Sequence, residues 1–96
     1  LFNCNFANVQ PHSGASANIA AFLAFMNPGD KFASLVLSDG GHLSHGLKIN
    51  ISGKYFTPVH YPLINDSTNP LDATIDYGAL RNLCLTEKPK MIWCGY

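Results

Sequence analysis

Phe32-Ala33-Ser34-Leu35-Val36-Leu37 is a short apolar run, and the glycine-rich stretch Ser38-Asp39-Gly40-Gly41-His42-Leu43-Ser44-His45-Gly46 follows it directly. The run lacks an alternation of polar and apolar residues, which favours a strand that is covered on both faces. Ligands of open α/β sheets bind beyond the carboxyl ends of the strands. The glycine-rich stretch therefore lies where such a sheet would place a binding site.

The segment before this strand predicts a helix. Residues 11–18 are small and polar, and residues 19–26 are rich in alanine with large apolar side chains on every side, which is typical of a buried helix. The turn signal Asn27-Pro28-Gly29-Asp30 ends it. Further upstream, residues 2–9 alternate loosely and predict a short strand.

The segment after the glycine-rich stretch continues the pattern of strands and helices. Residues 54–61 are aromatic and β-branched and predict a strand, and residues 62–72 predict a surface loop with two prolines. Asp76 is expected to open a helix that closes near Lys88, and residues 90–94 predict a last strand. Strands that alternate with helices indicate an α/β fold with a mostly parallel sheet.

The composition limits the class of protein. Apolar residues make up 47% of the 96 residues, which excludes a disordered chain. Charged residues make up only 12%, against about 25% in a typical domain, so we expect more protein to cover this chain and interpret it as an internal fragment. Six basic residues balance six acidic ones, so neither a nucleic acid nor an anionic membrane is an expected partner.

The cysteines indicate the redox environment. Cys4, Cys84 and Cys94 are an odd number without close spacing, so a disulfide framework is not expected. A reducing compartment, the cytoplasm, is the default interpretation.

The first chemical signal is Ser13-Gly14-Ala15-Ser16 at the start of the predicted helix. Backbone N–H groups without intrahelical partners point outward there, and the helix dipole favours negative charge. Gly14 lets the backbone approach a ligand closely. The stretch predicts a phosphate-binding turn, and an ordinary serine N-cap is the alternative; no P-loop or G-x-G-x-x-G fingerprint is present.

The second signal is the pair His42 and His45 among the glycines. One hypothesis is that an imidazole lies flat on an aromatic ligand ring while the other histidine holds a hydrogen-bond network. The alternatives are two histidines that serve only the backbone, or a metal site. No metal is expected, because carboxylate and cysteine ligands at zinc spacing are lacking nearby.

The ordered set of short motifs resembles the serine hydroxymethyltransferase family across nearly the whole chain. The motifs that carry the resemblance are Asn8-Val9-Gln10-Pro11-His12-Ser13-Gly14, Ala17-Asn18, Asn27-Pro28-Gly29-Asp30, Gly40-Gly41-His42-Leu43-Ser44-His45-Gly46, Ser52-Gly53-Lys54, Ile75-Asp76-Tyr77 and Lys88-Pro89-Lys90.

The resemblance implies an enzyme of the aspartate-aminotransferase fold type, in which residues 1–96 form the first, incomplete part of the large pyridoxal-phosphate-binding domain. Residues 62–74 are expected to be a surface-loop insertion. The implied reaction is glycine hydroxymethyltransfer, the interconversion of serine and glycine with tetrahydrofolate and 5,10-methylenetetrahydrofolate. A homodimer or tetramer is implied, and the fragment alone is expected to be inactive.

The resemblance also implies roles for individual residues. Ser13, Gly14 and Ala15 match the turn that binds the phosphate of pyridoxal 5'-phosphate, although many members have serine at the position of Ala15. His42 matches the histidine that stacks on the pyridine ring, and His45 matches a second active-site histidine.

The remaining implied site is the folate pocket, to which Leu37, Gly41 and Leu43 correspond. The lysine that carries the cofactor and the arginine that binds the substrate carboxylate are implied to lie outside this chain. Three alternatives stay open: another pyridoxal-phosphate enzyme of this fold type, such as an aldolase or decarboxylase; a non-catalytic interaction module; and a small zinc protein that uses His12, His42 and His45.

Overall fold

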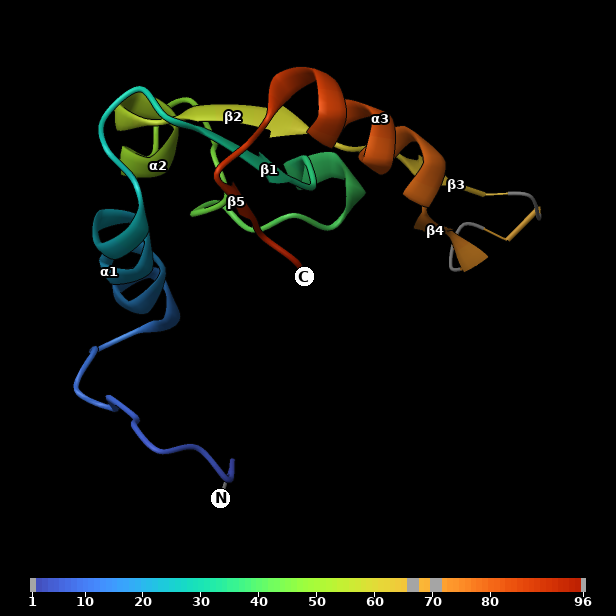
Figure 1. Ribbon diagram of the computed structural model, residues 1–96. Coiled ribbons are helices and arrows are strands. Elements are labelled where there is room, and N and C mark those ends of the chain that lie inside the picture. The colour runs from blue at the N-terminus through green and yellow to red at the C-terminus, as the bar shows by residue number, and fades with distance from the viewer. Residues whose placement is uncertain (1, 66–67, 70–71, 96) are drawn as a thin grey trace.

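A parallel three-stranded sheet organises the chain (Figure 1). The computed structural model describes residues 2–65, 68–69 and 72–95. Strand β1 (Lys31–Ser34) lies between β2 (Thr57–His60) and β5 (Met91–Ile92), and both neighbours run parallel to it. The predicted α/β class with a parallel sheet is therefore confirmed.

Strand β1 is covered on both faces, as its sequence predicts. On one face Phe32 packs with Phe22, Met26 and Phe56, and its ring lies 4.7 Å from that of Phe22, edge to face. On the other face Ala33 belongs to a second cluster, in which Leu35 and Tyr61 are also buried. The sheet thus has two small apolar layers, one against α1 (Gly14–Phe25) and one against α3 (Tyr77–Glu87).

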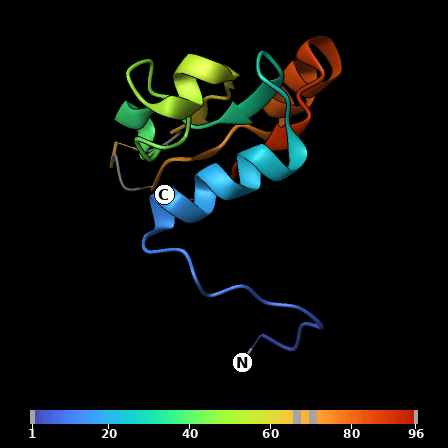
Figure 2. The same cartoon turned by 90° about the vertical axis from the view of Figure 1, so that its left-hand side faces the viewer.

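Helix α1 begins where the sequence predicts, because Ser13 caps it and accepts a hydrogen bond from the backbone N–H of Ser16. The prediction that this helix is buried is wrong for the described chain: only Phe22 is buried, and Leu23 and Phe25 are 69% and 73% exposed. In Figures 1 and 2 the helix lies at one side of the sheet.

The N-terminal segment does not form the strand that its alternation predicts. Residues 2–12 contain neither a helix nor a strand, and Figure 1 shows them running away from the sheet. Phe6 is 94% exposed. A strand needs a neighbour to satisfy its backbone hydrogen bonds, and no described strand lies beside this segment.

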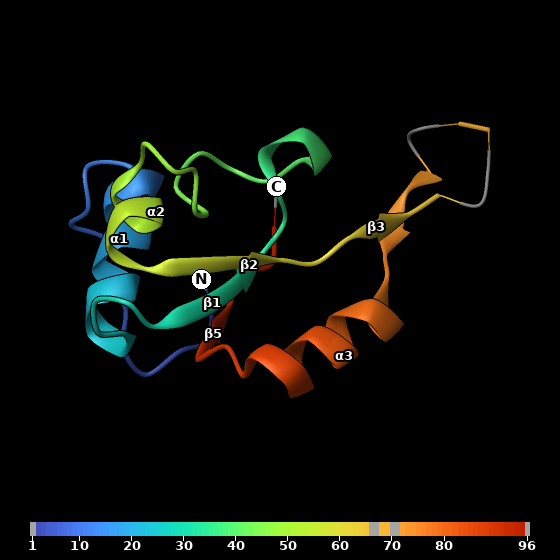
Figure 3. The same ribbon diagram turned by 90° about the horizontal axis from the view of Figure 1, so that it is seen from above.

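Four short elements were not predicted. The first is the 3₁₀ helix Leu37–Asp39, and the strand expected at residues 32–37 ends before it, at Ser34. Helix α2 (Ile51–Tyr55) replaces the start of the strand expected at residues 54–61, because the Asn50 side chain caps it by accepting from the Ser52 N–H. Strands β3 (Leu63–Ile64) and β4 (Thr74–Ile75) pair antiparallel (Figure 3), and β3 lies in the surface loop expected at residues 62–72 while β4 follows it. Residues 66–67 and 70–71 of that loop lie outside the described residues, and the insertion at 62–74 stays a prediction.

The C-terminal helix and strand follow the sequence closely. Asp76 caps α3 by accepting from the Ala79 N–H at 2.8 Å, and Lys88 ends it in a left-handed conformation. Strand β5 is shorter than residues 90–94, although the Trp93 N–H still donates to the Ala33 carbonyl at 2.8 Å. This hydrogen bond carries the pairing with β1 past the end of the strand and fixes the place of Trp93.

The turn after β1 leaves no room for a Cβ atom at Gly41. A Cβ on Gly41 would collide with the carbonyl oxygens of Leu35 and Val36. We expect Gly41→Ala to lower the free energy of unfolding of the full-length protein by about 1–3 kcal/mol, as overpacking does. Denaturant-induced unfolding measures the change.

The matched control is Gly14→Ala, since a Cβ there meets no atom within 4 Å. Alanine is the better helix former by up to about 1 kcal/mol, so this variant should be as stable as the wild type or more so. Equal stability of Gly41→Ala and the wild type would contradict the tight turn.

Candidate functional site

A cavity of about 510 Å³ brings the two predicted sites together. Its walls come from the start of α1, the glycine-rich loop and the residues after β5. The lining residues are Ser13, Gly14, Ala15, Asn18, His42, His45, Trp93, Cys94 and Gly95. The turn at Ser13 and the histidine loop are therefore neighbours in space, although about thirty residues of sequence lie between them.

The first turn of α1 presents backbone donors to this cavity. The Ser13 hydroxyl oxygen accepts from the Ser16 N–H at 3.1 Å, and the Ala17 N–H donates to the Ser13 carbonyl at 3.0 Å. Ser13 is thus an N-cap, as the alternative interpretation proposed. The N–H groups of Gly14 and Ala15 belong to the first turn of the helix, where no carbonyl four residues earlier in the helix can accept from them, and the space beside Gly14 is open. A small anion can approach these two groups directly.

The ring of His42 is exposed and held on one edge. Its Nδ1 lies 2.8 Å from the Ser44 hydroxyl and accepts from the Ser44 backbone N–H at 3.1 Å. The Ser44 hydroxyl in turn accepts from the Asn18 side-chain amide at 2.7 Å. The loop is thereby attached to α1 beside the cavity that both line.

The ring of His45 is buried and stacked. It lies parallel to Trp93, with an interplanar angle of 13° and ring centroids 5.3 Å apart. The His42 backbone N–H donates to its Nδ1 at 3.3 Å. Burial of the imidazole, and then the proximity of His42, lower the pKa of His45 below its usual value of 6.5. His45 is therefore neutral at neutral pH.

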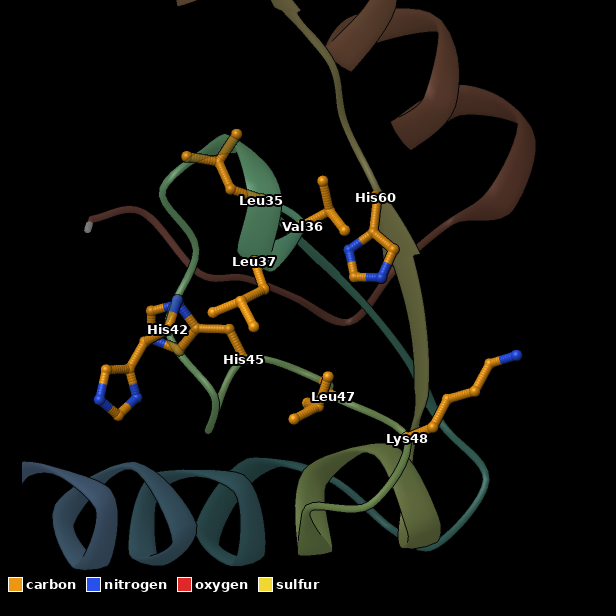
Figure 4. Close-up of a pocket in the computed structure, with 9 residues that line it drawn as sticks. Leu35, Val36, Leu37, His42, His45, Leu47, Lys48 and His60 are labelled. Carbon is orange, nitrogen blue, oxygen red and sulfur yellow. The ribbon is translucent and has the colours of Figure 1, made fainter.

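A second cavity, of about 390 Å³, adjoins the same two histidines (Figure 4). Leu37 lines it, together with Leu35, Val36, Gly46, Leu47, Lys48 and His60. Gly41 and Leu43, which were predicted to share a pocket with Leu37, line neither of these two cavities. Gly41 is packed against backbone carbonyls, and Leu43 is about half exposed.

Four residues that line the cavity were missed from the sequence: Asn18, Trp93, Cys94 and Gly95. Asn18 lies one helical turn after Gly14, a spacing that puts both on one face of α1 and was a usable signal. Trp93 was assigned to the core; it does pack on Phe22, with ring centroids 5.1 Å apart, and its other side lines the cavity.

Among residues 2–65, 68–69 and 72–95, no group of three or more His, Cys, Asp or Glu side chains is arranged to hold a metal ion. His12 does not line the cavity that contains His42 and His45. In the same described ranges, no helix has the length and apolar character that a membrane crossing requires.

The lowered pKa of His45 predicts a pH dependence of stability. The folded state disfavours the protonated imidazole, so the stabilising effect is complete above pH 6.5 and is lost as the pH falls through the lowered pKa. Between about pH 7 and about pH 5, we expect the wild type to lose more unfolding free energy than His45→Gln. Denaturant unfolding at several pH values measures both slopes, and His12→Gln is the control. Equal slopes for wild type and His45→Gln would refute the prediction.

Comparison with known proteins agrees with the motifs and the geometry. The family model for serine hydroxymethyltransferase matches residues 1–96. The chain is 52% identical to a serine hydroxymethyltransferase of Pelagibacter ubique over 95 residues, which is 99% of this chain and 21% of that protein. Over its whole length it is 51% identical to the Prochlorococcus marinus (strain AS9601) protein of the same name and 50% to that of Rippkaea orientalis, covering 22% and 21% of them.

The chain thus spans about a fifth of the length of these curated relatives. The family match covers all of the ordered motifs, including the start of α1 and the histidine loop, which both line the cavity. On this basis the chain belongs to the serine hydroxymethyltransferase family.

Proposed function

We propose that the full-length protein that carries this chain is a glycine hydroxymethyltransferase. It interconverts serine and glycine, with pyridoxal 5'-phosphate as cofactor and tetrahydrofolate and 5,10-methylenetetrahydrofolate as the one-carbon pair. The observation that carries the proposal is the cavity that the start of α1 shares with His42 and His45. The printed names of the relatives support the same activity.

The residues that line the cavity fit the cofactor. The N–H groups of Gly14 and Ala15 suit its phosphate, because the helix dipole adds to their hydrogen bonds and no side chain blocks Gly14. His42 would lie against its aromatic ring. When bound, the cofactor supplies an electron sink for the bonds around the amino acid's α-carbon. The chain itself supplies binding and orientation.

His45 has a supporting role in this proposal. Its neutral ring on Trp93 accepts the His42 backbone N–H, so it holds the loop in place without bringing a charge to the cavity. Trp93 closes the inner wall against the Phe22 cluster and keeps water from that side. A site of this kind excludes solvent while its polar groups stay aimed at the ligand.

The second cavity suits the flat pterin ring of the folate. Leu35, Leu37 and Leu47 give it an apolar lining, and it adjoins His42, where the one-carbon unit would be exchanged. Gly41 and Leu43 would act on this pocket through the shape of the loop. We also propose that the chain forms the first part of the large domain of a fold-type I enzyme, in a homodimer or tetramer whose further protein covers the exposed side of α1.

His42→Ala tests the proposal. We expect the turnover number for serine cleavage to fall at least about tenfold, because the ring of the cofactor loses its stacking partner and its alignment. The dissociation constant of pyridoxal 5'-phosphate should change less than about fivefold, since the phosphate contacts remain. Steady-state kinetics and cofactor absorbance measure these two effects.

The matched control for this experiment is His12→Ala, which removes an exposed histidine outside both cavities. Its turnover should equal that of the wild type. Unchanged turnover in His42→Ala would refute the stacking role, and a wild-type rate of one-carbon transfer that does not depend on tetrahydrofolate would favour the aldolase or decarboxylase alternative.

Ala15→Ser is expected to strengthen cofactor binding. The new hydroxyl would lie in the first turn of α1, beside the proposed phosphate position, where one hydrogen bond lowers the dissociation constant about fivefold. Equilibrium titration with pyridoxal 5'-phosphate measures it, and Ala24→Ser, near the other end of the same helix, should leave the constant unchanged. Weaker binding in Ala15→Ser would place the phosphate elsewhere.

A further inference from the structure

Ser44 connects helix α1 to the His42 ring. It is 1% exposed, and its hydroxyl oxygen lies 2.7 Å from the Asn18 side-chain nitrogen and 2.8 Å from His42 Nδ1. Asn18 and Ser44 are 26 residues apart in sequence. The three side chains form a continuous hydrogen-bonded chain from the helix to the loop, which we term the Asn18–Ser44–His42 relay.

The donors and acceptors of the relay fix the proton of His42. The Asn18 amide nitrogen can only donate, so the Ser44 oxygen accepts from it and its own proton is free to point at His42 Nδ1. The Ser44 backbone N–H also donates to that nitrogen at 3.1 Å. A nitrogen that accepts carries no proton, so the ring proton of neutral His42 lies on Nε2.

We propose that Asn18 and Ser44 are positioning residues, which act through His42. They hold its ring in one orientation and in the Nε2–H tautomer, so that the exposed edge of the ring offers a hydrogen-bond donor to the bound ligand and not a base. The statement about the ligand rests on the function proposed above; the statement about the ring does not.

The relay also links two parts of the cavity wall. Gly14, Ala15 and His42 all line the cavity, and Asn18 belongs to the same helix as the first two. A rotation of the loop would break the hydrogen bond between Asn18 and Ser44. The helix turn and the imidazole are therefore held at a fixed separation before any ligand arrives, which is the condition for a preorganised site.

The test uses the full-length protein with ¹⁵N-labelled histidine, first without added cofactor. Long-range proton–nitrogen spectra show which imidazole nitrogen carries the proton, and His42→Asn identifies the signals of His42. We expect an unprotonated Nδ1 in the wild type. Ser44→Ala should shift the ratio of the tautomers about fivefold towards Nδ1–H, the effect of one hydrogen bond. Ser44→Thr, which keeps the hydroxyl, should restore the wild-type ratio.

Kinetics of the loaded enzyme provide the second measurement. Ser44→Ala should lower kcat about fivefold and change KM for serine less than about twofold, since the loss concerns alignment. Asn18→Ala should also lower kcat, although Ser44 stays in place. The proposal can therefore be tested even if Ser44→Ala does not fold. The control is Ser38→Ala, which removes an exposed hydroxyl that donates to the neighbouring Asp39 carboxylate.

The outcomes separate the two proposals. A proton on His42 Nδ1 in the wild type, or a tautomer ratio and kcat that Ser44→Ala and Asn18→Ala leave unchanged, overturns the relay while the proposed function stands. A protein that shows the expected tautomer shift but binds no pyridoxal 5'-phosphate supports the relay and overturns the proposed function.

Discussion

The parallel pairing of β5 with β1 is the constraint on which the site depends. Because both strands point the same way, the loop after β1 and the residues after β5 leave the sheet at the same edge. The hydrogen bond from the Trp93 N–H to the Ala33 carbonyl continues this pairing and places the indole under His45. The start of α1 reaches the same edge, because Phe22 anchors the helix on Phe32.

The elements with strong local signals were predictable from the sequence. Strand β1, the start of α1 at Ser13 and the helix that Asp76 caps each depend on neighbouring residues, and the structure confirms them. The strand expected at residues 2–9 is absent, because a pattern of alternation cannot supply a neighbouring strand. Helix α2 was missed because five residues are too few for a periodic pattern.

The site, too, was predictable where local residues define it and not where tertiary packing does. The residue patterns predicted the turn at Ser13 and the histidine loop as sites, and the resemblance added their roles. The structure places them around one cavity, and their roles stay a proposal. Gly41 and Leu43 lie outside both cavities, since Gly41 packs against backbone carbonyls and Leu43 is about half exposed. The contact between Asn18 and Ser44 and the stacking of Trp93 on His45 could not be predicted, because each joins segments that only tertiary packing brings together.

Trp93 is the single tryptophan of these 96 residues, and it touches both the Phe22 cluster and the cavity wall. Its indole nitrogen is buried without a hydrogen-bond partner among the described residues. An indole in such a place is an intrinsic fluorescent probe. Its emission maximum depends on how far water reaches the interior, and its fluorescence intensity depends on the charge of the imidazole stacked against it.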